Sequence, residues 1–143
     1  MTSKIARATG ICWIQSVIEP SFLIDTNCCI YLFSQDYPEL LRRVAVAPVG
    51  SIALSAIAFT ELAHGSERGL VPDPVALEKL VRQMPVLPFD RAAAAAYAKL
   101  PFERGNFDRF IAAHAIALKL KIITRNVSDF EAIPGVCAED WTQ

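Results

Sequence analysis

Four short apolar runs, separated by segments with helical character, constrain the fold of this chain more than any other feature. The runs lie at 22–24, 51–54, 86–89 and 121–124. Each has only three or four residues, which suits a strand buried in a sheet better than a helix. This alternation of strands and helices predicts an α/β fold with a mostly parallel, short-stranded central sheet that is flanked by helices on both faces.

The intervals between the runs carry helical patterns with recognisable start signals. Helices are predicted at 38–47, 56–65, 74–84, 91–99 and 108–118, and a short edge strand at 136–138. Ser55 and Asp90 are predicted N-caps, and Asp73 before Pro74 is the residue pair that commonly opens a helix. We expect Gly65 near the C-terminus of the second helix.

Length and composition limit the classes of protein to consider. The 143 residues correspond to about one domain, and 53% hydrophobic residues provide a substantial core. A net charge of −1 excludes a polybasic tail, and no apolar run reaches the roughly 20 residues that span a bilayer. Four cysteines without a Cys-x-x-Cys pair indicate reduced thiols rather than a zinc site or a disulfide framework.

Residues 1–20 differ from the rest of the chain. Lys4 and Arg7 precede the apolar stretch 11–18, which is the charge order of a secretory signal. Gln15 interrupts that stretch and no Ala-x-Ala site follows it, so we expect an N-terminal extension of unknown role at 1–20 and a domain at 21–143.

Acidic residues gather where the predicted strands end. Asp25 directly follows the first strand, Glu61 lies on the helix after the second, Asp108 begins an almost wholly apolar helix, and Asp129 follows the fourth strand. Individually, each has a structural interpretation as a helix cap, a salt-bridge partner or a turn residue. In a parallel sheet, however, sites form beyond the carboxyl ends of the strands. Carboxylates brought together there repel one another, and a cation such as Mg²⁺ or Mn²⁺ relieves that repulsion.

Four sequence blocks resemble the PIN-domain proteins, and among these the VapC toxins of bacterial toxin–antitoxin modules. The acids in the blocks are separated by 36, 47 and 21 residues. The blocks read Phe-Leu-Ile-Asp-Thr-Asn from residue 22, Ser-Ala-Ile-Ala-Phe-Thr-Glu-Leu-Ala-His-Gly from 55, Phe-Asp-Arg-Phe-Ile-Ala-Ala-His-Ala from 107, and Ile-Ile-Thr-Arg-Asn-Val-Ser-Asp-Phe from 122. The resemblance covers about residues 22–141 and implies a PIN-like three-layer α/β/α fold.

The resemblance also implies a metal-dependent endoribonuclease that hydrolyses phosphodiester bonds in tRNA or another structured RNA. It assigns the catalytic role to Asp25, Glu61, Asp108 and Asp129, and metal binding by Mg²⁺ or Mn²⁺ to Asp25 and Asp108. The positions expected to support the site are Thr26, Asn27, Thr124 and Asn126. Some PIN nucleases carry an acid at the position of Asn126, whose amide brings no charge, and this leaves a second metal position open.

Partners follow from the same resemblance. It implies a cytoplasmic toxin, not bound to a membrane, that forms a homodimer and is blocked by a VapB-like antitoxin. Basic residues late in the chain are candidates for contacts with RNA phosphates; they are Arg104, Arg109, Lys119, Lys121 and Arg125. His114 lies six residues after Asp108, about 240° around a helix, so we expect a structural histidine.

Two other classes remain open on the sequence. A degenerate PIN fold would bind RNA or protein without cleaving it. A haloacid-dehalogenase-like phosphatase also places a nucleophilic Asp after its first strand, but it needs a second acid where this chain has Asn27. Such a phosphatase would form an aspartyl-phosphate, whereas an inert module would cut no RNA with any metal.

Overall fold

The computed structural model describes residues 18–101, 103 and 106–143, so the expectations for 1–17 and for Arg104 lie outside the described residues. Along the chain the elements are β1 (Phe22–Ile24), α1 (Thr26–Tyr31), α2 (Pro38–Val46), β2 (Ile52–Ser55), α3 (Ala56–Glu67), α4 (Pro74–Gln83), β3 (Val86–Leu87), α5 (Arg91–Ala98), α6 (Phe107–Leu118), β4 (Lys121–Ile123), α7 (Val127–Glu131) and β5 (Ala138–Glu139).

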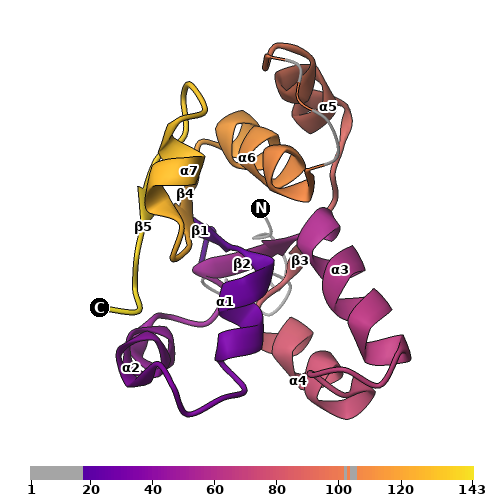
Figure 1. The fold of residues 1–143 in the computed structure, drawn as a ribbon, viewed down its shortest axis with the longest axis vertical. Helices are drawn as coiled ribbons and strands as arrows, with labels where there is room; N and C mark the ends of the chain where they lie inside the picture. Colours follow the sequence, from indigo (N-terminus) through magenta and orange to yellow (C-terminus); the bar gives the residue numbers. More distant parts are fainter. Residues whose placement is uncertain (1–17, 102, 104–105) are drawn as a thin grey trace, which may run out of the picture.

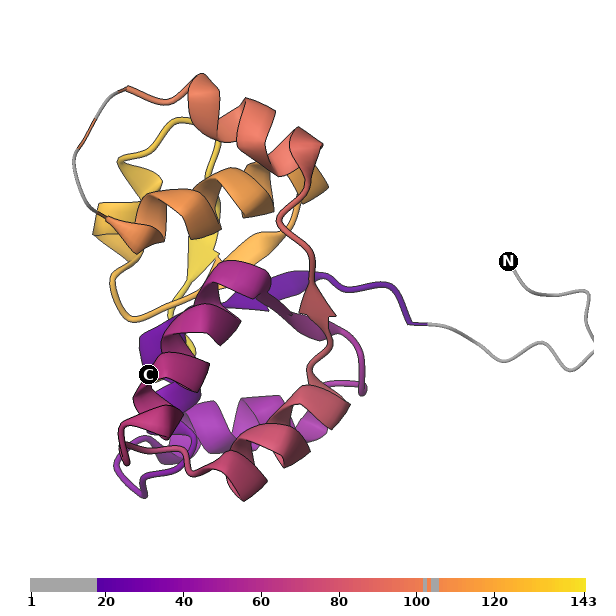
Figure 2. The same cartoon turned by 90° about the vertical axis from the view of Figure 1, so that its right-hand side faces the viewer.

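All five strands pair in parallel, in the order β3-β2-β1-β4-β5 (Figure 1). In Figure 2, α5 and α6 lie on one side of the strands and α2 and α4 lie on the other. This confirms the three-layer α/β/α architecture. The chain adds strands on one side of β1 first and then on the other, so the direction of winding reverses at β1. The carboxyl ends of β1 and β4 therefore meet at the kind of switch point where α/β proteins form sites.

The predicted helix starts are confirmed by side-chain hydrogen bonds. Ser55 accepts from the N–H of Ile57 at 3.0 Å, Asp73 accepts from Ala76 at 2.8 Å, and Asp90 accepts from Ala93 at 3.0 Å. These bonds satisfy N–H groups that have no partner within the first helical turn.

Helix α3 extends two residues beyond its predicted end. Gly65 lies near the C-terminus, as expected, and the helix continues to Glu67 with Arg68 as its C-cap. Helix α1 was considered only as a helix that Asp25 could cap, and α7 was not predicted. With six and five residues they are too short for an apolar period to appear, and their packing against the sheet stabilises them instead.

The core lies between the sheet and the two helical layers. Leu23, Ile24, Ile122 and Ile123 in the two central strands are fully buried. Helix α6 is buried over most of its circumference, as its apolar sequence predicts. The strand ends at the carboxyl edge are thereby held by a close-packed interior.

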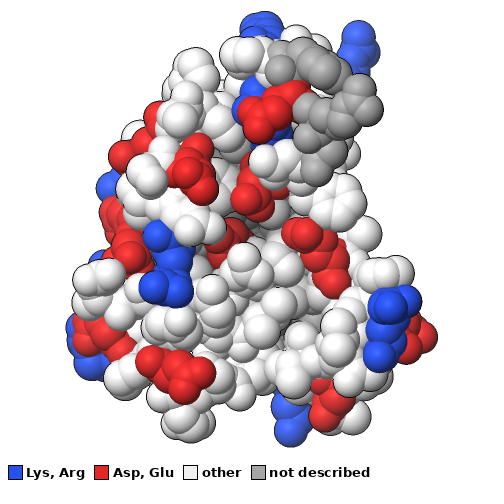
Figure 3. Space-filling model, viewed as in Figure 1, with Lys and Arg blue, Asp and Glu red and all other residues white. Residues whose placement is uncertain are grey.

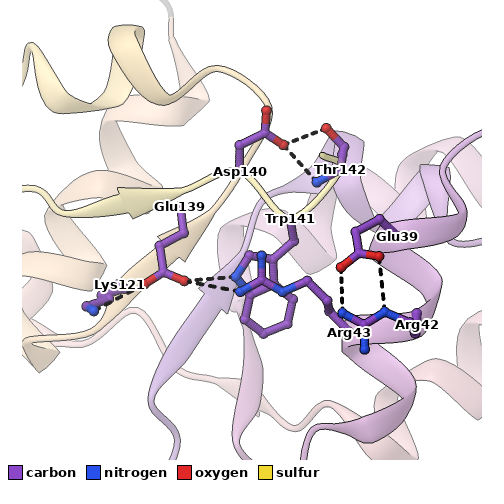
Figure 4. A network of polar contacts seen from close by, with 8 residues as sticks. All are labelled: Glu39, Arg42, Arg43, Lys121, Glu139, Asp140, Trp141 and Thr142. Atoms are coloured by element: carbon purple, nitrogen blue, oxygen red, sulfur yellow. Dashed lines mark hydrogen bonds and ion pairs between the residues drawn. The ribbon is translucent and has the colours of Figure 1, made fainter.

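The C-terminal segment is attached to α2 through Trp141 (Figure 4). The indole is buried, its ring meets Phe22 edge-to-face at 4.9 Å, and the Arg43 guanidinium stacks over it at 4.5 Å. The indole N–H donates to Glu139 at 2.9 Å, and Glu139 also pairs with Lys121 at 3.1 Å. These contacts hold edge strand β5 in place beside β4.

No helix within residues 18–101, 103 and 106–143 is long and apolar enough to cross a membrane. The three cysteines of these segments are free thiols: Cys28 and Cys29 are buried and Cys137 is exposed.

Candidate active site

Asp25 lies at the carboxyl end of β1 and has a double role. One oxygen of its buried carboxylate accepts from the backbone N–H of Cys28 at 2.8 Å, so the residue is the N-cap of α1. The other accepts from the Thr124 hydroxyl, at the end of β4, at 2.5 Å. Burial raises the pKa of Asp25, and these hydrogen bonds oppose the rise. Each oxygen keeps a second lone pair, so these hydrogen bonds orient the carboxylate and leave both oxygens able to accept another contact.

Glu61 reaches the same edge from α3. Its half-buried carboxylate accepts a hydrogen bond from the hydroxyl of Thr26, the first residue of α1, at 2.5 Å. Thr26 and Thr124 thus each orient one acid of the set. Asn27, the other expected supporting residue on α1, is exposed beside Thr26.

Asp108 stands in the first turn of α6. The N-cap of that helix is Asn106, whose side chain accepts from the N–H of Asp108 at 2.8 Å. The interpretation of Asp108 as a cap alone is therefore wrong. The pKa of Asp108 is raised, and burial is the largest cause. The negative charges of Asp25, Glu61 and Asp129 raise it further. Asp108 is therefore close enough to the other three acids for their charges to act on it.

Asp129 approaches from α7 and is exposed. Asn126 is the N-cap residue of that helix, and its backbone N–H donates to the Thr124 hydroxyl at 3.0 Å. Thr124 therefore joins the loop before α7 to Asp25. Asn126 has an exposed side chain, so it is accessible from the same edge.

Figure 3 shows acidic side chains gathered around the middle of the face on which α1, α3, α6 and α7 meet in Figure 1. Oxygen donors of this kind fit a hard divalent cation rather than zinc. Within the described segments, no three His, Cys, Asp or Glu side chains already lie close enough together to hold one ion. An ion held by three of these acids would require a side-chain movement, for which the half-buried Glu61 and the exposed Asp129 have room.

The basic residues divide into two kinds. Arg109 is buried and donates to Glu103 at 3.0 Å and to the Pro101 carbonyl at 2.5 Å, so the expectation that it meets RNA is wrong. Lys121 is paired with Glu139. By contrast, Arg125 is exposed directly after β4, where it stacks over the Tyr37 ring at 5.1 Å and donates to the Tyr37 hydroxyl at 3.1 Å.

Sequence reasoning missed two features of this edge. His114 is buried, as expected of a structural histidine, but it also contacts Ser55 at the start of α3. A hollow beside Glu61, lined by residues of α3 and by Phe107, was not anticipated either. Both arise from contacts between α3 and α6, which no local pattern records.

Comparison with known proteins identifies relatives over most of the chain. The PIN domain family model matches residues 22–136. The chain is 33% identical to a tRNA(fMet)-specific endonuclease VapC of Salmonella typhimurium over 84% of this chain and 97% of that protein. It is 32% identical to the protein of that name from Shigella flexneri, over 85% and 98%. The crystal structure of DNA-bound VapBC from Salmonella typhimurium superposes with a TM-score of 0.76 at 29% identity, over 85% and 98% of the two chains.

Proposed function

The chain belongs to the PIN domain family, and from this premise we propose that it is an endoribonuclease and the toxin of a VapBC-type toxin–antitoxin system. Its partner is a VapB-like antitoxin and its substrate is RNA. Two relatives are named for initiator tRNA, which makes that tRNA the first substrate to test. We further propose that residues 21–143 form the catalytic domain and that 1–20 are an extension to it.

The single observation that carries this function is the convergence of four acids. Asp25, Glu61, Asp108 and Asp129 come from the end of β1 and from α3, α6 and α7, and Asp108 is influenced by the charges of the other three. A fold stabilised only by packing gains nothing from such repulsion. A cation that binds between the acids, and a reaction that uses it, account for their placement.

The nuclease is metal-dependent, and we propose Mg²⁺ or Mn²⁺ as the ion because the donors are carboxylate oxygens. Asp25 and Asp108 would hold it, with Glu61 and Asp129 beside them. When bound, such an ion lowers the pKa of a water molecule and polarises phosphoryl oxygens.

The residues of the chain supply orientation. Thr124 and the Cys28 N–H fix Asp25, and Thr26 fixes Glu61. In the reaction one water oxygen forms a bond to phosphorus while the bond from phosphorus to the 3′ oxygen breaks. The products are a 5′-phosphate and a 3′-hydroxyl, and the leaving oxygen takes up a proton. Arg125 lies where it can contact a phosphate of the bound RNA.

The test is cleavage of purified tRNA by the antitoxin-free protein with Mg²⁺ or Mn²⁺, compared with EDTA. Asp25→Asn is the diagnostic variant, because the amide oxygen still accepts from Cys28 and keeps the helix cap while the charge is lost. Asp73→Asn is the matched control, since Asp73 caps α4 with the same geometry away from the acids.

We expect cleavage that requires the ion, is abolished in Asp25→Asn and is unchanged in Asp73→Asn. A folded wild-type protein that cuts no RNA with either ion would contradict the nuclease and favour an inert binding module. Equal cleavage by Asp25→Asn and wild type would instead remove Asp25 from the site.

A further inference from the structure

A hollow of about 480 Å³ adjoins the carboxylates on the side of α3. Glu61 and His64 line it from one face of that helix, because residues three positions apart are neighbours on a helix surface, and Arg68 lines it from the C-cap position. Gly65 lies between them, and a Cβ placed there would meet only Leu70, at 3.8 Å. The absent side chain leaves the floor of the hollow open. Its volume falls in the range of roughly 300–1,000 Å³ that is usual for small-molecule sites.

Phe107 forms the opposite wall from the N-terminus of α6, and 51% of it is exposed. Its ring meets Phe110 edge-to-face at 6.5 Å, and Phe110 stacks on Tyr97 at 4.2 Å. An aromatic ring that is supported from behind and open in front is held in one orientation. Such a ring is a platform on which another flat group can stack.

The hollow contains a cationic side chain as well as the acidic Glu61. Arg68 is exposed and forms no ion pair with any carboxylate of the described segments, so its guanidinium is free to bind an anion. Arg125, on the other side of the acids, is already stacked on Tyr37. A polyanion that approaches four carboxylates needs cations beside them, and Arg68 supplies one next to Glu61.

We propose that Phe107 and Arg68, with His64 between them, form a nucleotide subsite for the RNA substrate. The base of one unpaired nucleotide stacks on Phe107, and a phosphate of the same strand contacts Arg68. Aromatic rings combined with cations are how proteins bind single-stranded nucleic acid. Because Glu61 belongs to both the hollow and the acid set, this nucleotide lies next to the phosphodiester that is cut. The inference rests on the proposed nuclease function.

Steady-state cleavage of tRNA by the full chain tests the subsite. We expect Phe107→Ala to raise KM about tenfold with little change in kcat, since stacking of a base on an aromatic ring is worth that much or more. Phe107→Leu keeps the apolar contact with Phe110 but not the stacking and should behave like Phe107→Ala, whereas Phe107→Trp should restore KM. Arg68→Ala should raise KM. It should also make the slope of log binding constant against log salt concentration shallower by about one, because one fewer counterion is released.

The matched controls are Val75→Ala and Arg82→Ala, which remove an exposed apolar and an exposed basic side chain from α4. Their KM values should equal that of wild type. If wild type cuts RNA and Phe107→Ala has the KM of Val75→Ala, the subsite is refuted while the nuclease stands. A Phe107→Ala variant that loses affinity for the antitoxin but not for RNA would equally refute it.

A second readout does not depend on cleavage. Single-stranded RNA that contains 2-aminopurine is titrated into the inactive Asp25→Asn protein, where stacking on Phe107 should quench the fluorescence. The quench should vanish in the double variant Asp25→Asn, Phe107→Ala and persist in the double variant Asp25→Asn, Val75→Ala. A quench without cleavage by wild type would uphold the subsite while contradicting the nuclease, and binding without a Phe107-dependent quench would overturn the subsite.

Discussion

The Nδ1 atom of His114 lies 2.8 Å from the hydroxyl oxygen of Ser55, and both side chains are buried. The Ser55 hydroxyl oxygen already accepts from the N–H of Ile57 at 3.0 Å. Its own hydrogen is therefore free to be donated to Nδ1 of the neutral imidazole. Ser55 in turn caps α3, which carries Glu61, while His114 belongs to α6, which carries Asp108. This bond thus helps set the spacing between two acids of the site.

We expect His114→Leu to lower the free energy of unfolding by about 1–3 kcal/mol, because it leaves a buried hydroxyl without its partner. Denaturant titration of His114→Leu, Ser55→Ala and the double variant should reveal a coupling energy of at least about 0.5 kcal/mol. His64→Leu, at the exposed second histidine, provides the control pair and should combine additively with Ser55→Ala. If the losses in unfolding free energy for His114→Leu and Ser55→Ala simply added in the double variant, the hydrogen bond between the two side chains would be contradicted.

Acid should weaken the protein through His114. Burial lowers the pKa of His114 below its usual value of 6.5, so in this window the unfolded chain binds more protons than the folded one. Stability therefore decreases as the pH falls through 6.5 toward the lower folded-state pKa. The measurement is the free energy of unfolding of wild type minus that of His114→Leu between pH 7.5 and 5.5. We expect this difference to shrink on acidification, and a constant difference would oppose the assignment.

Asp108→Asn should stabilise the metal-free protein while it abolishes cleavage. The pKa of Asp108 is raised, so the folded state favours the neutral form and ionisation near pH 7 opposes folding. The amide removes that opposition and leaves the Asn106 cap, which binds a backbone N–H, unchanged. Thermal unfolding in EDTA checks the sign, with a higher melting temperature expected for the variant at pH 7. At a pH well below 3.8 the gain should disappear.

Divalent ions should stabilise the wild type by binding the folded state. An ion present at a hundred times its dissociation constant adds about 2.7 kcal/mol. We expect the melting temperature to rise with Mg²⁺ or Mn²⁺ in wild type and in Asp73→Asn, but much less in Asp108→Asn. Equal shifts in all three proteins would indicate binding away from the four acids.

Trp141→Ala should be the most destabilising change at the C-terminus, by about 3–5 kcal/mol, as is usual for a buried aromatic residue. The variant loses the packing against Phe22 and the hydrogen bond to Glu139 (Figure 4). Arg43→Ala removes the stacked cation and its partly exposed ion pair with Glu139 at 3.9 Å, and should cost less than about 1 kcal/mol. Denaturant titration distinguishes the two, and a Trp141→Ala protein as stable as Arg43→Ala would show that the segment contributes little.

Much of the fold was predictable because its signals are local. The residues that cap α3, α4 and α5 bind N–H groups two or three positions away, so a short stretch of sequence contains both partners. The apolar runs of three or four residues located β1, β2 and β4 within one residue. Three of the acids, Asp25, Glu61 and Asp129, follow predicted strands, and every parallel strand ends on the same side, so the sequence predicted that these three would lie at one edge. Asp108 begins a helix, and it was added to the set by the resemblance to the PIN-domain proteins.

Other features depended on partners far away in the sequence. Arg109 and Arg125 are equally basic in the sequence, yet α6 buries the first against Pro101 while the end of β4 exposes the second. Burial is a property of the packed chain, and residue type alone does not determine it.

The sequence by itself therefore determined the alternation of elements, the helix caps and the set of acids, because each depends on neighbours along the chain or on the common polarity of parallel strands. The tertiary structure alone decided how the acids are oriented and what lies beside them. Thr124 meets Asp25 across 99 positions and His114 meets Ser55 across 59. Phe107 and Arg68 come to line one hollow only because α6 packs on α3, a contact that forms when both helices bury their apolar faces in the same core.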